Sequence, residues 1–348
     1  METLVRRPGE DSGERPKRDR EANVSVVSHR KDADGLSSAA LVRYFTGAQV
    51  FLTDYSDMVA TLENVPETED TYICDLGLNK STFEGFANQV SRLGRSGRVH
   101  YLDHHPLNVE FSERLKSLGV DLFHSTEECT AMLIYKKFEE KLSSSSAMKI
   151  AACCGAITDY MDLQPFAKKT IASFDRQFLL YEATLLSFSI AMIGRDGFES
   201  NSHLIQIVKE LANQKLPHEI PDASSYAQEF ASHSAALIER VKREGKKMRN
   251  FAYFKTKESS TGNVANFLIG AFNTNVGIAF REEEQGFYEI SMRASDESKH
   301  DLGRIVQGIS TKFGTSGGGH PKAAGARIKT TQFEEFLRLL DESLSLPP

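Results

Sequence analysis

The sequence has no apolar stretch near the roughly 20 residues that a helix needs to cross a bilayer. It also lacks the apolar segment of a secretory signal, because the first 22 residues contain 12 charged side chains and few apolar ones. We therefore expect no membrane anchor. We expect residues 1–22 to form a disordered tail, since so polar a segment cannot bury a core.

Cysteine is scarce, with four residues in 348, and no pair has the CxxC spacing of a zinc or redox motif. Cys74 and the adjacent Cys153 and Cys154 lie inside apolar runs. This pattern favours core thiols in a reducing compartment. The sequence therefore predicts a cytoplasmic protein without disulfides or a cysteine-ligated zinc.

An excess of basic residues is also missing, since 42 Lys and Arg face 48 Asp and Glu, for a net charge of −6. The whole molecule thus has no general attraction for a polyanion. If the protein binds nucleic acid, it must do so through local groups of basic and polar side chains.

The length of 348 residues, with 40% hydrophobic and 26% charged residues, is typical of a globular protein with two domains. In the first half, short apolar runs that read as strands alternate with segments of helical spacing, and this alternation predicts an α/β fold with a parallel sheet. The strand-like runs are residues 24–28, 49–53, 71–74 and 99–102.

The last hundred residues mix three strand-like segments with three helical ones and predict a smaller α+β domain. A long helix between residues 223 and 249 is expected to link the two domains.

Acidic and imidazole side chains follow several apolar runs of the first half. In a parallel sheet the carboxyl ends of the strands share one edge, where ligands collect. One site could therefore gather these residues, each of which follows a short apolar stretch that reads as a strand: His29, Asp32, Asp34, Asp75, Asp103, His104, His105 and Asp159.

Mixed imidazole and carboxylate ligands favour a divalent ion, with Mn²⁺ first and Mg²⁺ or Co²⁺ as alternatives. Asp32 and Asp34 fall on one side of an extended loop and repel each other unless a cation or a shared proton lies between them. The candidate ligands are more numerous than one catalytic ion can bind. Two ions that share a carboxylate are therefore expected.

These motifs resemble the DHH phosphoesterase superfamily, which includes RecJ-type exonucleases, nanoRNase-like enzymes and cyclic-dinucleotide phosphodiesterases. The resemblance is carried by the loop from His29 to Gly35, by Asp75, by the Asp103-His104-His105 trio and by Asp159. The sequence context of the first motif is most similar to archaeal RecJ-like proteins. The spacing of His29 and the two aspartates in the first loop differs by one residue from both RecJ-like and nanoRNase-like loops.

The resemblance implies a role for each of these residues. His29, Asp32 and Asp75 would hold one metal ion, and Asp34, Asp75, His104 and Asp159 would hold the other. Asp103 would orient one of the two histidines, and His105 would contact the scissile phosphate or the leaving group.

The C-terminal part resembles the DHH-associated domain of the same superfamily. The resemblance implies substrate contacts from Ser291, Arg293, Gly317, Gly318, Gly319 and His320. The expected organisation is a tail at 1–22, a DHH catalytic domain at 23–200, a helical linker at 201–249 and a substrate-binding domain at 250–348.

The implied function is a Mn²⁺-dependent phosphodiesterase that shortens single-stranded DNA or RNA from an end, or degrades short oligonucleotides, by two-metal catalysis. A hydrolase of cyclic dinucleotides or of 3′-phosphoadenosine 5′-phosphate stays open as the alternative, because the acidic balance suits a small substrate. A non-catalytic binding protein of the replication machinery is the third reading. Replication or repair partners and self-association are left open.

Overall fold

The computed structural model describes residues 23–195, 200–258, 261–283 and 286–347. The tail expected at 1–22 lies outside these residues. The chain forms two compact units, Met1–Ala227 and Gln228–Pro348. The boundary falls inside α11 (Ala223–Glu244).

The first unit is built on a five-stranded sheet in the order β2-β1-β3-β4-β5, and every neighbouring pair is parallel. This confirms the expected α/β class. The central strands β1 and β3 are buried along nearly their whole length, as parallel strands covered by helices on both faces must be. The strands are β1 (Val24–His29), β2 (Gln49–Thr53), β3 (Asp70–Cys74), β4 (Arg98–Asp103) and β5 (Asp121–His124).

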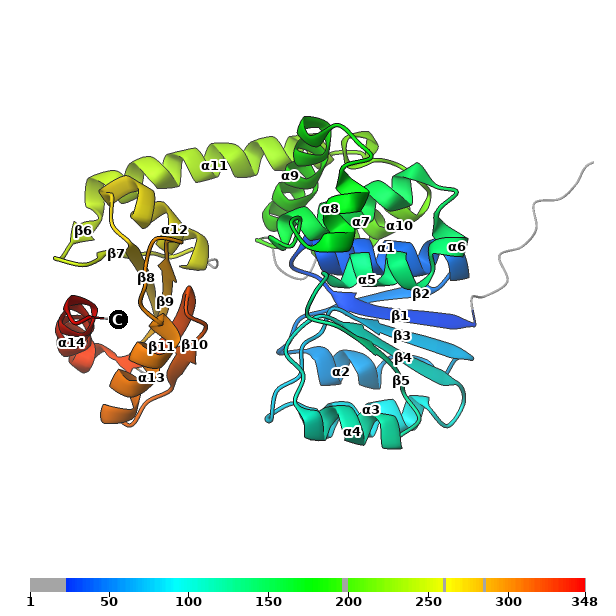
Figure 1. The fold of residues 1–348 in the computed structure, drawn as a ribbon, viewed down its shortest axis with the longest axis horizontal. Helices are drawn as coiled ribbons and strands as arrows, with labels where there is room; N and C mark the ends of the chain where they lie inside the picture. Colours follow the sequence, from blue (N-terminus) through cyan, green and yellow to red (C-terminus); the bar gives the residue numbers. More distant parts are fainter. Residues whose placement is uncertain (1–22, 196–199, 259–260, 284–285, 348) are drawn as a thin grey trace, which may run out of the picture. The chain divides into compact units, whose positions relative to one another are not determined.

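Helices cover both faces of this sheet (Figure 1). Val26 faces the larger core, and its neighbour Val27 faces a second core against the other helices, as the alternation along a strand requires. The second core is covered by α2 (Met58–Glu63), α3 (Phe83–Leu93) and α4 (Val109–Ser117). The larger core is covered by α1 (Ala33–Thr46), α5 (Thr130–Lys137), α6 (Glu139–Leu142), α7 (Ser146–Thr158), α8 (Pro165–Ile171), α9 (Arg176–Ile193) and α10 (Ser200–Ala212).

The helix α10 buries Leu204, Ile207, Val208 and Leu211 in the larger core of the first unit. The 3₁₀ turn η1 (Pro217–Glu219) and the first residues of α11 also pack there. The segment expected as a linker at 201–249 therefore contributes its first part to the core of the first unit.

The second unit has a six-stranded sheet in the order β10-β11-β9-β8-β7-β6, with β7 and β8 parallel and the other pairs antiparallel. Its strands are β6 (Lys246–Lys247), β7 (Ala252–Lys255), β8 (Val276–Glu283), β9 (Phe287–Ala294), β10 (Gly317–Gly319) and β11 (Ala323–Lys329). On one face of the sheet lies α12 (Thr261–Phe272), and α13 (Leu302–Lys312) and α14 (Phe333–Ser345) pack on the other. A short 3₁₀ turn, η2 (Thr330–Gln332), precedes α14.

The cysteines of the chain lie in its interior. All four cysteines are buried and free, which confirms the expected core thiols.

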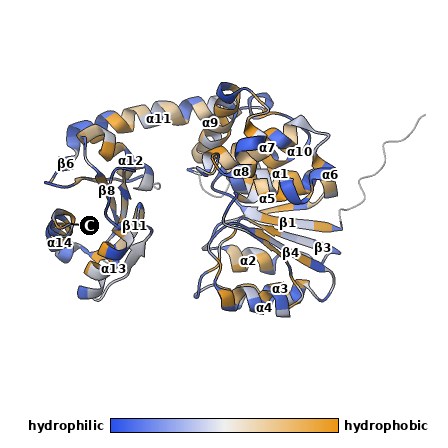
Figure 2. Cartoon of the chain, viewed as in Figure 1, coloured by the Kyte–Doolittle hydropathy of each residue, from blue (hydrophilic) through white to orange (hydrophobic). Residues whose placement is uncertain are grey.

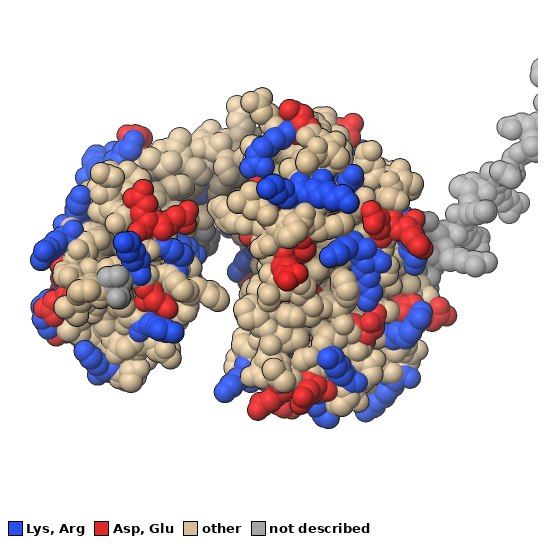
Figure 3. Space-filling view, in the orientation of Figure 1, with Lys and Arg blue, Asp and Glu red and all other residues tan. Residues whose placement is uncertain are grey.

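Hydrophobic residues line β1 in Figure 2. On the face shown in Figure 3, basic and acidic side chains are interspersed over each unit. Among the described residues, no helix combines the length and apolar character that crossing a membrane requires.

Candidate metal centre

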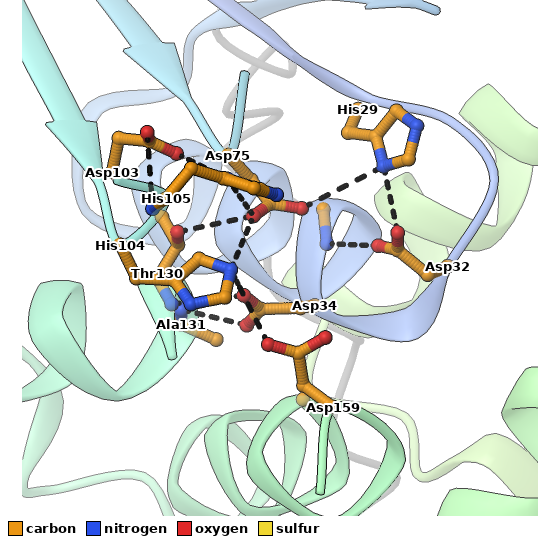
Figure 4. Close-up of polar contacts among 12 residues, drawn as sticks. His29, Asp32, Asp34, Asp75, Asp103, His104, His105, Thr130, Ala131 and Asp159 are labelled. Atoms are coloured by element: carbon orange, nitrogen blue, oxygen red, sulfur yellow. Dashed lines mark hydrogen bonds and ion pairs between the residues drawn. The ribbon is translucent and has the colours of Figure 1, made fainter. Parts of the chain in front are cut away.

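Three neighbouring strands bring the expected ligands to one edge of the sheet. His29 ends β1, Asp75 follows β3, and Asp103 ends β4, with His104 and His105 directly after it. Because β1, β3 and β4 are parallel neighbours, these side chains meet at the carboxyl edge, as Figure 4 shows.

One group of candidate ligands consists of His29, Asp32 and Asp75, whose donor atoms lie within 4.8 Å of one another. His29 Nδ1 is 2.7 Å from Asp32 Oδ2 and 3.8 Å from Asp75 Oδ2. Asp32 also caps α1, since its Oδ1 accepts the N–H of Gly35 at 2.9 Å. A side chain at position 35 would collide with the carbonyl of His29, so this loop requires glycine.

A second group consists of Asp34, His104 and Asp159. His104 Nε2 lies 3.3 Å from Asp159 Oδ2 and 3.4 Å from Asp75 Oδ1. Asp75 therefore lies within 4 Å of a histidine of each group. It also adopts a left-handed backbone with φ of 57°, a strained conformation that the surrounding structure must hold in place.

Asp34 is oriented by the N-terminus of α5. Its two oxygens accept the backbone N–H groups of Thr130 and Ala131, each at 2.8 Å. The hydroxyl of Thr130 donates to Asp75 Oδ1 at 3.1 Å, so one helix end positions both carboxylates. Gly155 on α7 leaves room for Asp34, because a Cβ there would lie 2.6 Å from Asp34 Oδ1.

The expectation that Asp159 follows a strand is wrong. Asp159 is the C-terminal cap of α7, and its carboxylate reaches the site from a helix (Figure 4). The apolar run before it is buried on nearly every side, from Ile150 to Ala156. A helix buried in this way carries the same continuous apolar signal as a buried parallel strand.

Asp103 orients His105, which settles the choice between the two histidines. Asp103 Oδ1 accepts the Nδ1–H of His105 at 2.9 Å, and the hydroxyl of Tyr101 donates to Asp103 Oδ2 at 3.1 Å. With its proton on Nδ1, the ring presents Nε2 as an acceptor. The hydroxyl of Tyr55 donates to that nitrogen at 3.0 Å.

The carboxylates of the site repel one another. Burial, together with the charges of Asp34 and Asp32, raises the pKa of Asp75 well above its usual range. Burial and Asp34 likewise raise the pKa of Asp159 to about 6. Burial alone would lower the pKa of His29, but Asp32 and the other nearby carboxylates outweigh it and raise the pKa to about 10. The carboxylates of the site therefore ionise together only where positive charge lies between them.

The donor set fits divalent cations. Asp32, Asp34, Asp75 and Asp159 supply carboxylate oxygens, and His29 and His104 supply imidazole nitrogens. In addition, His29 Nε2 is buried without a hydrogen-bond partner among the described residues, and the nearest carboxylate oxygen, on Asp54, is 3.7 Å away. A cation at this edge would reduce the repulsion between the carboxylates and would give His29 Nε2 a partner.

Three neighbours of the site were not predicted from the sequence: Asp54, Tyr55 and Thr130. Lys31 pairs with Asp54, and His29 and Lys31 lower the pKa of that carboxyl. Burial and Asp75 raise the pKa of Tyr55, which keeps its hydroxyl protonated. Asp54 and Tyr55 directly follow β2, so the strand-end signal that identified the other residues also marks these two.

The expected substrate residues of the second unit lie at one end of its sheet. Ser291 and Arg293 on β9 pair with Gly325 and Ala323 on β11. The hydroxyl of Ser291 is 2.7 Å from that of Thr261, at the start of α12. The Arg293 guanidinium lies so close to Gly262 that a side chain at position 262 would collide with it.

The three glycines expected to contact substrate form the edge strand β10, and His320 begins the turn into β11. Gly318 and Gly319 have φ of 152° and 142°, which other residues rarely adopt. Gly317 packs directly against Ser310 of α13, and the Gly319 carbonyl lies against Gly303. Close packing against α13 therefore accounts for the glycines, and the backbone of this edge strand keeps one side unpaired by another strand.

A family model matches most of the second unit, and solved structures share the fold of both units. Residues 246–346 match the model of the DHHA1 domain. No curated protein matches the chain.

Several solved structures share the fold over nearly the whole chain. A DHH domain from a protein described as belonging to a family of ribosomal proteins matches with a TM-score of 0.67 and 15% identity over 93% of this chain and 87% of that one. A pGpG-specific phosphodiesterase, PggH from Vibrio cholerae, has a TM-score of 0.55 and 16% identity over 92% of this chain and 98% of its own.

RecJ from Thermus thermophilus, solved in complex with Mn²⁺, has a TM-score of 0.58 and 15% identity over 93% of this chain and 52% of its own. At these identities the likeness concerns the fold, and it extends through both units. The chain therefore shares the fold of these solved structures, one of which is described as a DHH domain, and its residues 246–346 match the DHHA1 domain model.

Proposed function

We propose that this protein is a Mn²⁺-dependent phosphodiesterase that removes nucleotides from an end of single-stranded DNA or RNA, or degrades short oligonucleotides. The observation that carries the proposal is the set of three overlapping ligand groups at the sheet edge, in which Asp75 lies near both His29 and His104. Two cation sites that share a carboxylate suit hydrolysis of a phosphodiester. The four buried thiols support a cytoplasmic location.

The candidate ligands form two sets, one for each of two ion positions. His29, Asp32 and Asp75 would hold one divalent ion, and Asp34, His104 and Asp159 would hold the other together with Asp75. Divalent ions bound there would offset the negative charge of the phosphate and lower the pKa of an attacking water. The strained backbone of Asp75 and the α5 N-terminus keep the carboxylates oriented before any ion binds.

His105 is the group that handles the proton of the leaving oxygen. Asp103 fixes its Nδ1–H, so Nε2, which accepts the Tyr55 hydroxyl in the substrate-free protein, is the atom that contacts the phosphate or the leaving group once substrate displaces that hydroxyl. In the reaction the water oxygen bonds to phosphorus and loses a proton to His105 Nε2, the ester bond to the leaving oxygen breaks, and His105 passes that proton to the leaving oxygen. Asp103 stabilises the positively charged ring that exists between these two transfers.

The DHHA1 domain contributes the substrate contacts in this proposal. Arg293 binds a phosphate through two parallel hydrogen bonds, with Ser291 beside it on β9. Gly317, Gly318 and Gly319 offer backbone without side chains, which allows a nucleotide to approach closely, and His320 adds a hydrogen bond or a stacking contact.

A small-nucleotide hydrolase is the second candidate. The net charge of −6 and the interspersed charges in Figure 3 favour it, because proteins that grip long strands usually neutralise many phosphates. The likeness to a pGpG-specific phosphodiesterase supports the same alternative, as the likeness to RecJ supports the first.

Digestion of end-labelled substrates with Mn²⁺ separates these functions. DNA and RNA of two to thirty nucleotides would be labelled at either end and digested at several salt concentrations. The proposal predicts stepwise release from one end of strands longer than a few nucleotides, slowed by salt. Turnover restricted to dinucleotides, cyclic dinucleotides or 3′-phosphoadenosine 5′-phosphate, with little effect of salt, would replace it with the alternative. No hydrolysis of any substrate would support a binding protein.

A further inference from the structure

Tyr160 directly follows the candidate ligand Asp159, in the turn that ends α7. The N–H of Tyr160 bonds to the carbonyl of Ile157 at 3.3 Å, and the N–H of Met161 bonds to the carbonyl of Ala156 at 2.8 Å. These two bonds define a Schellman motif, in which the residue at the position of Tyr160 must be left-handed. Tyr160 accordingly has φ of 58°.

A tyrosine is unexpected at this position. The left-handed conformation strains every residue with a Cβ, and helices that end in this motif usually carry glycine or asparagine there. The other non-glycine residues with positive φ in the described ranges are all polar: Asp75, Gln214, Asp222 and Asn273. The helix end therefore gives no structural reason for an aromatic ring.

Packing does not explain the tyrosine either. Its side chain is 91% exposed, the highest value among the large apolar residues that the structure describes as exposed. The ring thus recovers none of the strain by burial in its own unit. Leu163, three residues further along the same turn, is also exposed, at 74%.

The turn that carries this ring is held in place from several sides. Met161 packs against the core of the unit. Asp162 pairs with Arg176 at 3.0 Å, and the N–H of Gln164 bonds to the carbonyl of Met161 at 3.2 Å. Its first residue, Asp159, points into the metal centre (Figure 4). The backbone that carries this exposed aromatic ring is thus held in place, one residue from a group that would bind metal.

We propose that Tyr160 stacks on a nucleobase next to the phosphodiester being cleaved. This inference rests on the proposed function and sharpens it, because it makes the substrate a base-bearing nucleotide chain and not a phosphate ester in general. An aromatic side chain stacks on any base, since each base has a π-face. The exposed ring loses water contact on binding, and the held turn limits the entropy lost.

The experiment compares the wild type with Tyr160→Gly and Tyr160→Phe in the presence of Mn²⁺. The substrates are a trinucleotide with all bases and the same trinucleotide with an abasic sugar beside the first cleaved bond. The inference predicts that Tyr160→Gly lowers kcat/KM for the complete substrate between about fivefold and 150-fold, the range that stacking of one base contributes. Tyr160→Phe retains activity, and Tyr160→Gly has little effect on the abasic substrate.

Glycine is the preferred residue at this turn, so Tyr160→Gly should keep the melting temperature of the wild type or raise it. This separates loss of stacking from loss of fold. Tyr181→Ala serves as a control at another exposed tyrosine, on α9, and should leave both rates unchanged.

Equal losses on the complete and the abasic substrates, or no loss on either, would overturn the inference while the phosphodiesterase proposal stands. A wild type without activity on either substrate would instead overturn the proposed function on which the inference rests.

Discussion

At the scale of single residues, Tyr55 contacts His105, the group proposed to transfer the proton. It donates to His105 Nε2 at 3.0 Å, while Asp103 accepts from Nδ1 on the other side of the ring at 2.9 Å. The ring of Tyr55 also packs against His29, with centroids 4.9 Å apart. The hydroxyl therefore helps to fix the plane of His105, and the ring supports a candidate ligand.

Tyr55→Phe should remove only the first of these effects. One hydrogen bond contributes about 0.5–1.5 kcal/mol, so kcat should fall between about twofold and tenfold with the melting temperature nearly unchanged. Steady-state kinetics on one oligonucleotide with Mn²⁺ would measure this. Tyr72→Phe is the matched control, because Tyr72 stacks on His100, away from the strand ends that carry the site. A kcat equal to that of the wild type would show that Tyr55 does not position His105.

At the scale of secondary-structure elements, the opposite edge of the first sheet is held by an ion network. His100 on β4 bonds to Asp70 at the start of β3 and to Asp121 at the start of β5, each at 2.9 Å. Burial opposes ionisation of both carboxyls, but His100, with Arg98 and Lys137, outweighs it and lowers the pKa of each below the usual 3.8. This network joins three parallel strands.

The network should make the stability of the protein sensitive to acid. Because the folded state lowers these two pKa values, the unfolded chain takes up protons first as the pH falls through about 4. The stabilisation is present above that pH and is lost as the pH drops through the lowered values. Urea unfolding from pH 6 to pH 3 should therefore show a steeper loss in the wild type than in His100→Ala. Parallel pH profiles of the two proteins would contradict this account.

Most elements of the first sheet follow from the sequence, and the exceptions have physical causes. The strands β1 to β4 are short apolar runs that end in polar residues, and this signal is local. The helix α7 resembles a strand in sequence because burial on nearly all sides removes the amphipathic pattern that distinguishes a helix. The strand β10 consists of glycines, whose low strand propensity gives no such signal, and only pairing with β11 and packing on α13 define it.

At the scale of the whole molecule, the sequence predicted two domains and the structure has two compact units. The position of their boundary could not be predicted, because α11 continues through it without a break in the helical pattern. The candidate ligands from His29 to His105 could be collected because parallel strands share an edge, whereas Asp159 reaches the site from the end of α7. Tyr55 carries the strand-end signal of β2, but Thr130 depends on how α5 packs beside that edge, which no local pattern reveals.

The central claim is that these gathered side chains hold divalent ions that drive phosphodiester hydrolysis. The most direct test is release of labelled nucleotide by the wild type and by His104→Ala, with Mn²⁺ and with a chelator. His203→Ala, on α10, is the matched control. We predict that the chelator abolishes release by the wild type and that Mn²⁺ restores it. His104→Ala should lose activity by about a thousandfold or more, as loss of catalytic electrostatic groups does, while keeping its melting temperature without metal. Full activity of His104→Ala, or of the wild type in chelator, would contradict the account.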